Sequence, residues 1–376
     1  MTSRERLQIV LSGGIPDCVP VAPDTSNMIP AKRTGKPFWD LYLYNDPPVW
    51  RAYIETAKYF GFDSLMDGYC PVFFDELGEI DYEKEEYIIA RTPDRIITQH
   101  ARCAGGKMFW DGEVIVYYID NPPSVVKPCK IKLPDVPDRW ERVEGRREYP
   151  QGEALIALAK QELGEQGLLG VFCGSTKLLQ NEDDILGYYD DPGPYIERRD
   201  VLLAKSVERF DKLMSLDCKP DFICVGSSGT LITQTPAMFR ELGLPIAKKI
   251  TALCKQHGVP SHVHSCGPEA ALVKIMAEET DLTVIDPLEV PPMGDCDLAE
   301  LKRLYGDRLV LKGNLHTTKV MLMGSVGCVK DASKRAITDA ADGGRFILST
   351  GDQCGRDTPE ENLFAMIETA RTFGRY

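Results

Sequence analysis

The fold class is decided by four short runs in the C-terminal half of the chain, PSHVHSCG (260–267), LTVIDPLE (282–289), RLVLKGN (308–314) and RFILSTGD (345–352). Each run is rich in β-forming residues and ends in Gly, Asp or another polar residue, as buried strands do. Helical patterns lie between the runs. This regular alternation predicts parallel strands that are joined by helices.

The same pattern extends toward the N-terminus. Four further strands are expected at DCVPVAPD (17–24), GFDSLMDGY (61–69), LLGVFCG (168–174) and DFICVGS (221–227). Eight strand–helix units predict an α/β fold of the (β/α)8 TIM barrel type. An open doubly wound sheet is the alternative, but no GxGxxG follows the first strand, which disfavours its dinucleotide-binding version.

The segments between the strands carry the usual signals of helix ends. VWRAYIETAKYFG (49–61) predicts a helix between the first two strands, and residues 237–258 have apolar residues at three-and-four spacing up to Gly258, a good C-cap. Thr358 followed by Pro359 predicts the N-cap and first residue of a last helix.

Residues 78–135 interrupt the alternation with strand-like runs that are separated by Gly and Asp-Gly turns. We expect one domain over residues 1–376, with this segment inserted as antiparallel strands after the second barrel strand, on the side of the active site. Residues 119–149, rich in Pro and charge, are expected to link it to the next helix. Its aromatic residues form either a lid or the insertion's own small core.

The composition restricts the function classes. The chain has 376 residues, of which 43% are hydrophobic, and a net charge of -13, which argues against nucleic-acid binding. It lacks a signal-peptide pattern and any apolar run of ~18 residues, so we expect a cytoplasmic protein without a membrane span. Its 12 cysteines are irregularly spaced, so in a reducing compartment they pack as small hydrophobes or remain available for metal.

The strongest chemical signal is the run HVHSCG (262–267). Because side chains alternate along a strand, His264 and Cys266 project to one side at the carboxyl end of a barrel strand, where catalytic groups of this fold gather. An imidazole and a thiolate are typical zinc ligands. Cys354, after the last expected strand, is the predicted third ligand, which leaves one position for water or substrate.

Further polar residues follow the expected strands. Glu289 ends the run after the His264 strand and is predicted as a fourth zinc ligand; its alternative is a hydrogen-bond acceptor behind the ligands. Asp24, Asn314 and His316 are assigned to substrate binding, with helix capping or loop packing as the alternative for each. Two more strand-end carboxylates, Asp67 and Asp352, are candidates for shaping the pocket.

Taken together, HVHSCG, DPLEVPPMGDCDLAELKRLYGDRLVLKGN (286–314) and GGRFILSTGDQCGRDTPEENL (343–363) resemble the uroporphyrinogen decarboxylase superfamily, and more closely its corrinoid-dependent methyltransferase branch. The likeness covers roughly residues 1–70 and 150–376. It implies a catalytic zinc on His264, Cys266 and Cys354, with Glu289 at the position of a further ligand. It also implies a corrinoid (cobalamin), which a partner protein must carry because no D-x-H-x-x-G stretch is present here.

Two departures from the superfamily bear on the substrate. The decarboxylases carry an Arg-rich N-terminal motif that grips substrate carboxylates, whereas residues 12–28 read SGGIPDCVPVAPDTSNM, which disfavours porphyrinogen decarboxylation. The coenzyme M enzymes show Gly-Cys at a longer spacing from Thr-Pro, whereas this chain reads DQCGRDTP (352–359). The identity of the substrate therefore stays open.

The predicted function is a zinc-dependent methyltransferase that moves a methyl group between a small substrate and a corrinoid on a carrier protein. The substrate is a thiol, methyl ether, thioether or methylamine, and the direction of transfer and a homodimer are left open. The main alternative is a metal-free decarboxylase-like lyase acting on a carboxylic acid, with Lys32, Arg33 and Arg356 as cations. A non-enzymatic barrel and a purely structural zinc are two further alternatives; the latter needs four protein ligands.

Overall fold

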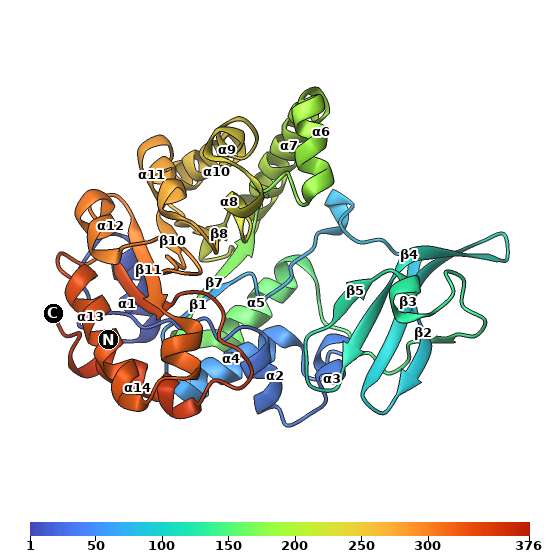
Figure 1. Ribbon diagram of the computed structural model, residues 1–376, viewed down its shortest axis with the longest axis horizontal. Coiled ribbons are helices and arrows are strands. Elements are labelled where there is room, and N and C mark those ends of the chain that lie inside the picture. Colours follow the sequence, from blue (N-terminus) through green and yellow to red (C-terminus); the bar gives the residue numbers. More distant parts are fainter.

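The computed structural model describes residues 1–376. A curled parallel sheet forms its centre, with the strand order β1-β7-β8-β9-β10-β11-β12 (Figure 1). The strands are β1 (Ser64–Asp67), β7 (Gly167–Phe172), β8 (Phe222–Cys224), β9 (Ser261–His264), β10 (Val284–Asp286), β11 (Val310–Leu315) and β12 (Phe346–Thr350). Each strand coincides with one of the predicted runs, although β7 begins one residue before its run and β11 ends one residue after its run.

A short N-terminal segment closes this sheet. Val21 makes a parallel bridge to Leu348 of β12, and Ala22 N–H donates to the Leu348 carbonyl at 2.9 Å. On the other side, Asp63 N–H, just before β1, donates to the Val21 carbonyl at 2.8 Å. The segment around Val21 therefore lies between β12 and β1 as the eighth strand, and the predicted TIM-barrel fold is confirmed. Its pairing is short because Pro20 and Pro23 have no N–H to donate.

Helices follow most of the strands on the outside of the barrel (Figure 1). The longer ones are α1 (Ser3–Leu11), α4 (Val49–Phe60), α5 (Gly152–Leu163), α6 (Glu182–Asp190), α7 (Gly193–Ser215), α10 (Leu244–His257), α11 (Ala270–Glu279), α12 (Leu298–Tyr305), α13 (Val326–Ala340) and α14 (Glu360–Thr372). Short ones are α2 (Met28–Arg33), α3 (Phe38–Tyr42), α8 (Thr230–Thr233), α9 (Pro236–Leu242), three 3-10 turns at Asp75–Leu77 (η1), Pro128–Ile131 (η2) and Gly164–Gln166 (η3), and a π-helical segment at Thr317–Leu322 (η4). No helix combines the length and the apolar character that crossing a membrane requires.

The predicted helix ends are confirmed in part. Gly258 caps α10 in the left-handed conformation at φ 67°. The prediction that Thr358 caps α14 was wrong, because the backbone is still extended at Pro359 (φ -60°, ψ 133°). The helix begins one residue later, and the Thr358 side chain makes no capping hydrogen bond.

The interior of the barrel is apolar at its N-terminal end. Alternate residues of successive strands meet there and are covered by Leu7, Val10 and Leu11 of α1. This layer also contains Ala22, Leu65, Leu168, Phe222, Cys224, Val284, Val310 and Ile347. Because side chains alternate, the residues two positions further along each strand face the upper part of the same interior.

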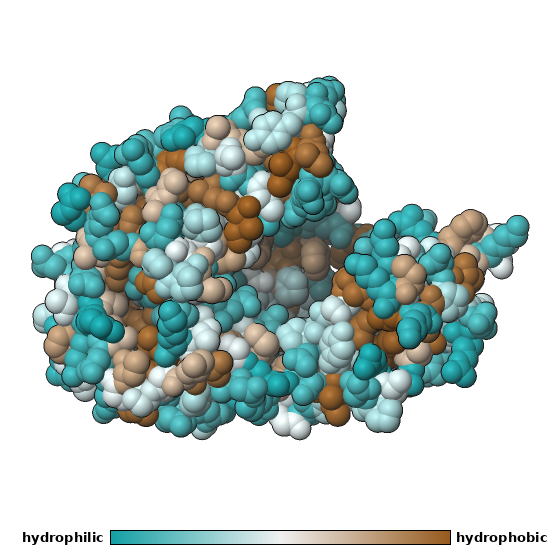
Figure 2. Space-filling model, in the orientation of Figure 1, coloured by the Kyte–Doolittle hydropathy of each residue, from teal (hydrophilic) through white to brown (hydrophobic).

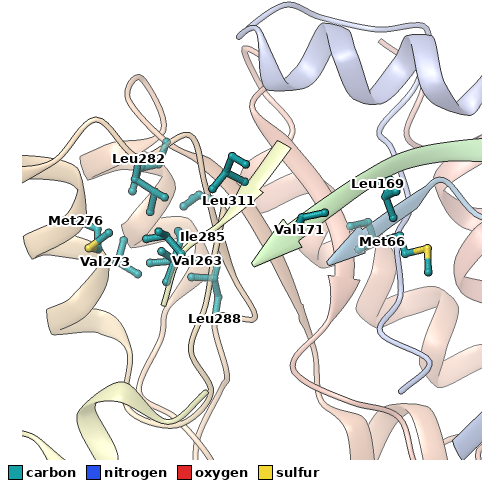
Figure 3. Close-up of a cluster of buried hydrophobic side chains, with 14 of the residues drawn as sticks. Met66, Leu169, Val171, Val263, Val273, Met276, Leu282, Ile285, Leu288 and Leu311 are labelled. Carbon is teal, nitrogen blue, oxygen red and sulfur yellow. The ribbon is translucent and has the colours of Figure 1, made fainter. Parts of the chain in front are cut away.

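The outward-facing residues of the strands pack against the helices. Figure 3 shows Val273 and Met276 of α11 beside Ile285 of β10 and Leu282, with Val263 and Leu311 on the neighbouring strands. All are buried in one large cluster that surrounds the barrel. This packing fixes the strands, and therefore the residues at their carboxyl ends, in place.

The antiparallel insertion after β1, the second barrel strand, is also confirmed, and it is larger than predicted. It has the strand order β5-β4-β3-β2-β6 and lies to one side of the barrel (Figure 1). Its strands are β2 (Lys84–Thr92), β3 (Arg95–Ala104), β4 (Lys107–Tyr118), β5 (Ser124–Val126) and β6 (Glu141–Arg142). The last two come from the segment expected to be a linker.

The inserted sheet has a small core of its own, formed by Ile89, Ile97, Val114 and Val116. Other residues of the sheet, Tyr117 among them, pack against Leu43 beyond α3. The side of the molecule seen in Figure 2 is hollowed between the barrel and this sheet. A cleft of about 1240 Å³ lies between the sheet and helices α3 and α4. Its lining includes Tyr42, Trp50, Glu86 and Arg146.

Candidate metal centre

A layer of charged side chains lies directly above the apolar floor of the barrel. Lys312 of β11 forms a buried ion pair with Asp286 of β10, and Asp286 Oδ1 lies 3.0 Å from His262 Nε2. Asp67 of β1 reaches the same His262 nitrogen at 3.5 Å. Burial opposes ionisation of Asp286, but the Lys312 ammonium outweighs it and holds the pKa of Asp286 well below its usual range.

Asp286 also orients His264, the first predicted ligand. His264 Nδ1 lies 3.1 Å from Asp286 Oδ1. An ionised carboxylate only accepts, so Nδ1 carries a proton, and Nε2 points away from Asp286 toward Asp352 at the barrel mouth. Burial alone would lower the pKa of His264, but the charge of Asp286 raises it well above its ordinary value.

Cys266 and Glu289 lie on two adjacent loops that hold each other. Glu289 Oε2 accepts a hydrogen bond from Gly267 N–H, and Glu269 Oε2 accepts one from Leu288 N–H at 2.9 Å. The sulfur of Cys266 lies 2.9 Å from the Ser228 hydroxyl oxygen. Each loop therefore donates a backbone N–H to a carboxylate of the other loop, so the two predicted ligands are held beside each other. Burial raises the pKa of Glu289.

Three sets of potential ligand atoms lie close together at the barrel mouth, with the atoms of each set within 4.8 Å of one another. They are Asp24 with His264 and Asp352, Asp67 with His264 and Asp286, and Cys266 with Glu289 and Asp352. Imidazole nitrogen, thiolate sulfur and carboxylate oxygen are the donors that zinc accepts. The residues present therefore fit a zinc ion.

Cys354, the predicted third ligand, belongs to none of these sets. It is fully buried, and burial raises the pKa of its thiol to about 12. Its N–H donates to the Asp24 carbonyl at 2.9 Å, and its own carbonyl accepts from the Ser26 hydroxyl at 2.9 Å. The structure thus includes His264, Cys266 and Glu289 in the sets of potential ligands but leaves the buried Cys354 thiol outside them. The zinc ligand set stays a prediction.

The three residues assigned to substrate binding have different surroundings. Asp24 is buried and accepts hydrogen bonds from the Tyr69 hydroxyl at 2.5 Å and from Ser26 N–H at 2.8 Å. Asn314 lies in β11 two residues beyond Lys312, so it faces the upper barrel interior. His316 Nδ1 accepts from the backbone N–H groups at the start of η4, which is a capping role. His316 Nε2 is buried without a hydrogen-bond partner.

Sequence analysis missed three residues of this site, Asp286, Lys312 and Glu269. The sequence did contain a signal for Lys312. In the run RLVLKGN, Val310 lies in the inward-facing register of an otherwise apolar strand, and Lys312 shares that register. A charge at such a position needs a buried partner, and Asp286 on the neighbouring strand supplies it.

The cations named for the lyase alternative are already paired. Lys32 lies 3.2 Å from Asp357, and Arg33 lies 2.9 Å from Glu360. Arg356 contacts Asp120 at 2.8 Å and Asp357 at 3.2 Å. Each of the three cations is therefore already paired with a protein carboxylate, which would compete with the carboxylate of a substrate.

Apolar side chains border the metal sets at the mouth. Phe172, 47% exposed at the end of β7, lies so close over Gly68 that no side chain fits there. Ile232, 61% exposed, lies against Gly267, where an added methyl group would meet it at 3.0 Å. Both glycines have positive φ, 75° and 92°. Met293 is 58% exposed and precedes a glycine that touches the Gly267 carbonyl. These three residues form an apolar rim.

The C-terminal part of the chain matches a known protein family. Residues 215–373, from the end of α7 to α14, match the family model described as uroporphyrinogen decarboxylase (URO-D). The predicted resemblance to this superfamily is confirmed. The matched part contains His264, Cys266, Glu289 and Cys354.

Among solved structures, a methyltransferase from Methanosarcina mazei has the same fold, with a TM-score of 0.64 and 16% identity over 99% of each chain. A B12-independent methionine synthase from Shewanella sp. W3-18-1, in complex with selenomethionine, has a TM-score of 0.44 and 11% identity over 95% of this chain and 98% of that one. No curated protein matches the sequence.

Proposed function

We propose that this chain is a zinc-dependent methyltransferase that moves a methyl group between a small substrate and a corrinoid carried by a partner protein. The observation that carries the proposal is that two sets of potential ligands from separate strand ends, one with the imidazole of His264 and one with the thiol of Cys266, share a carboxylate at the mouth of the barrel. Zinc held there by His264, Cys266 and a carboxylate would supply a Lewis acid for the sulfur, oxygen or nitrogen of the substrate.

The residues around the ligands have defined tasks in this proposal. Asp286 fixes the orientation of His264 by accepting a hydrogen bond from Nδ1–H, so that Nε2 faces the mouth. Lys312 keeps Asp286 ionised and prevents it from taking that proton. Glu289 accepts a hydrogen bond from Gly267 N–H with one carboxylate oxygen. The other oxygen has no protein partner, so it is available to zinc when no substrate is bound.

The apolar rim supports the corrinoid part of the proposal. Phe172, Ile232 and Met293 present exposed apolar side chains beside the ligand sets. Docking of a flat, largely apolar macrocycle over such side chains is favourable because it removes apolar surface from water. This chain shows no corrinoid-binding segment of its own, so in the proposal the corrinoid arrives on a partner and docks over the rim. The methyltransferase from Methanosarcina mazei shares the fold.

The test begins with zinc analysis of the purified chain, followed by methyl transfer. Zinc-loaded protein is mixed anaerobically with free cob(I)alamin and a panel of methyl ethers, thioethers and methylamines, and in the reverse direction with methylcobalamin and thiols. Transfer is followed by the change in corrin absorbance. Wild-type protein should hold about one zinc per chain and react with at least one member of the panel, whereas Cys266→Ala should lose both properties.

Cys129→Ala is the matched control, because this thiol is exposed in η2 of the inserted segment. It should retain zinc and activity. Folded wild-type protein that takes up no zinc contradicts the proposal and favours the metal-free lyase, which decarboxylation of candidate acids would then test. Zinc-loaded protein that transfers no methyl group in either direction also contradicts it.

A further inference from the structure

Asp352 occupies an unusual position at the mouth of the barrel. It follows β12 by two residues, and its backbone has φ 97°, a conformation that residues other than glycine rarely adopt. The residue before it, Gly351, is fixed because its N–H donates to the Leu315 carbonyl of β11 at 2.7 Å. Strain of this kind is retained where the surrounding structure dictates the direction of a side chain.

The carboxylate of Asp352 connects the two arms of the metal centre. It lies 3.5 Å from His264 Nε2, the nitrogen that Asp286 leaves free. It is also the member shared by the set that contains His264 and the set that contains Cys266. No other residue is common to those two sets. A cation between His264 and Cys266 would therefore have Asp352 within ligand distance.

Cys354, two residues later, is fixed in a different direction. Its side chain is fully buried, and both sides of its backbone are bound, by the Asp24 carbonyl and the Ser26 hydroxyl. The backbone of Cys354 is therefore held in place, and its buried thiol lies against the hydroxyls of Thr350 and Thr358. The same loop thus offers two potential ligands, and the fold presents the carboxylate.

We propose that Asp352, and not Cys354, is the metal ligand that the end of β12 supplies, so that the zinc of the proposed methyltransferase has a single thiolate ligand, Cys266. This inference rests on the proposed function for the presence of zinc, and it replaces the ligand that the sequence resemblance implied. The protein ligands are then His264, Cys266 and Asp352, with Glu289 adjacent.

The first test uses wild-type protein and needs no substitution. The chain is loaded with Co²⁺ in place of zinc, and the near-ultraviolet sulfur-to-cobalt absorption is measured. Its intensity rises with the number of thiolate ligands, so it can be compared with Co²⁺ complexes that have one and two. Intensity typical of one thiolate supports the inference, and intensity typical of two overturns it.

The second test compares variants. Asp352→Asn should weaken zinc binding by more than the ~10–100-fold that loss of a supporting residue typically costs, and Cys354→Ser should retain one zinc and an unchanged cobalt spectrum. Asp357→Asn, an exposed carboxylate in the same loop, is the control and should bind zinc like wild type. Zinc loss in Cys354→Ser with tight binding in Asp352→Asn overturns the inference.

The two proposals fail in different ways. If the wild-type chain binds neither zinc nor cobalt, the proposed function fails, and the ligand assignment falls with it. If the chain binds one metal ion through two thiolates and transfers methyl groups, only the assignment of Asp352 fails. If Cys354→Ser does not fold, the cobalt spectrum of the wild-type protein still decides between the two ligands.

Discussion

Two carboxylates, Asp286 in the barrel and Glu86 in the inserted sheet, are both buried and both paired with a cation, but their hydrogen-bond partners differ. Glu86 accepts hydrogen bonds from the hydroxyls of Thr98 and Tyr117, at 2.6 and 2.9 Å, and pairs with Arg146. Asp286 is held by Lys312 and by two histidine nitrogens. Both charges are therefore compensated, as buried charges must be.

The two networks differ in whether a partner of the carboxylate is also a potential metal ligand. Glu86 and Arg146 line the cleft beside the sheet, and His100 Nε2 lies 3.9 Å from Glu86, but neither Glu86 nor His100 belongs to a set of potential metal ligands. His264 uses Nδ1 for Asp286, and its second nitrogen lies 3.5 Å from Asp352 in such a set. A buried charge thus indicates a metal site when one of its partners belongs to a set of potential ligand atoms, and burial alone does not distinguish the two cases.

Breaking the barrel network should have the largest effect. Lys312→Met leaves the charge of Asp286 buried without its cation, which typically costs about 3–5 kcal/mol of unfolding free energy. Because Asp286 then no longer holds His264 in one tautomer, zinc affinity should also fall by about 10–100-fold. Urea unfolding and a zinc competition titration measure the two effects.

The exposed Lys274→Met on α11 is the control and should change stability by less than about 0.5 kcal/mol. If Lys312→Met lost stability but bound zinc as tightly as wild type, the barrel network would be as purely structural as the one in the sheet.

The network in the inserted sheet should affect stability alone. Glu86→Gln removes charged hydrogen bonds worth about 1.5–3 kcal/mol at neutral pH, and zinc content should not change. Although burial opposes it, hydrogen bonds from Thr98 and Arg146 lower the pKa of Glu86. A pKa that is lower in the folded state stabilises the protein at pH values above the unfolded pKa of ~4.3. This stabilisation is lost as the pH falls through the folded-state pKa.

The stability difference between wild type and Glu86→Gln should therefore be greatest near neutral pH and shrink below about pH 4.3. Urea unfolding at several pH values measures it, with the exposed Glu144→Gln as the control. A difference that stays constant down to pH 3, or a loss of zinc in Glu86→Gln, would contradict the assignment.

The sequence was sufficient for the barrel because each strand is a compact run with its own end signals. All eight runs coincide with the observed strand or bridge, from Val21 to β12, apart from one residue at an end of β7 and of β11. The inserted sheet was harder to delimit. Glu141 and Arg142 pair with β2 through backbone groups, and their exposed charged side chains gave no strand pattern. Pairing of this kind depends on the partner strand and leaves little trace in the local sequence.

The site was predictable where ligands lie on a strand and less so where they lie on loops. His264 is placed by the alternation of β9, which a sequence shows directly. Cys354 and Asp352 lie beyond β12, where no period fixes the direction of a side chain. Which of them faces the mouth depends on the positive φ of Asp352 and on contacts to Asp24 and Ser26, which are far away in the sequence.

The smallest effect is expected at the apolar rim. The double substitution Ile232→Ala and Met293→Ala removes apolar surface that a docked corrinoid would cover, worth roughly 1 kcal/mol, or about a fivefold increase in KM for the corrinoid. The kcat, zinc content and unfolding free energy should stay unchanged, because both side chains are more than half exposed. Steady-state methyl transfer at varied cobalamin concentration measures this.

Leu304→Ala is the matched control for the rim. Leu304 is an exposed apolar residue in the last turn of α12, and that end of the helix returns to the opposite face of the barrel. If it raised KM as much as the rim substitutions, a general loss of apolar surface would explain both. If the rim substitutions lowered kcat at an unchanged KM, the rim would act on the metal centre rather than on docking. An increase in KM alone would support docking of the corrinoid partner on the apolar rim.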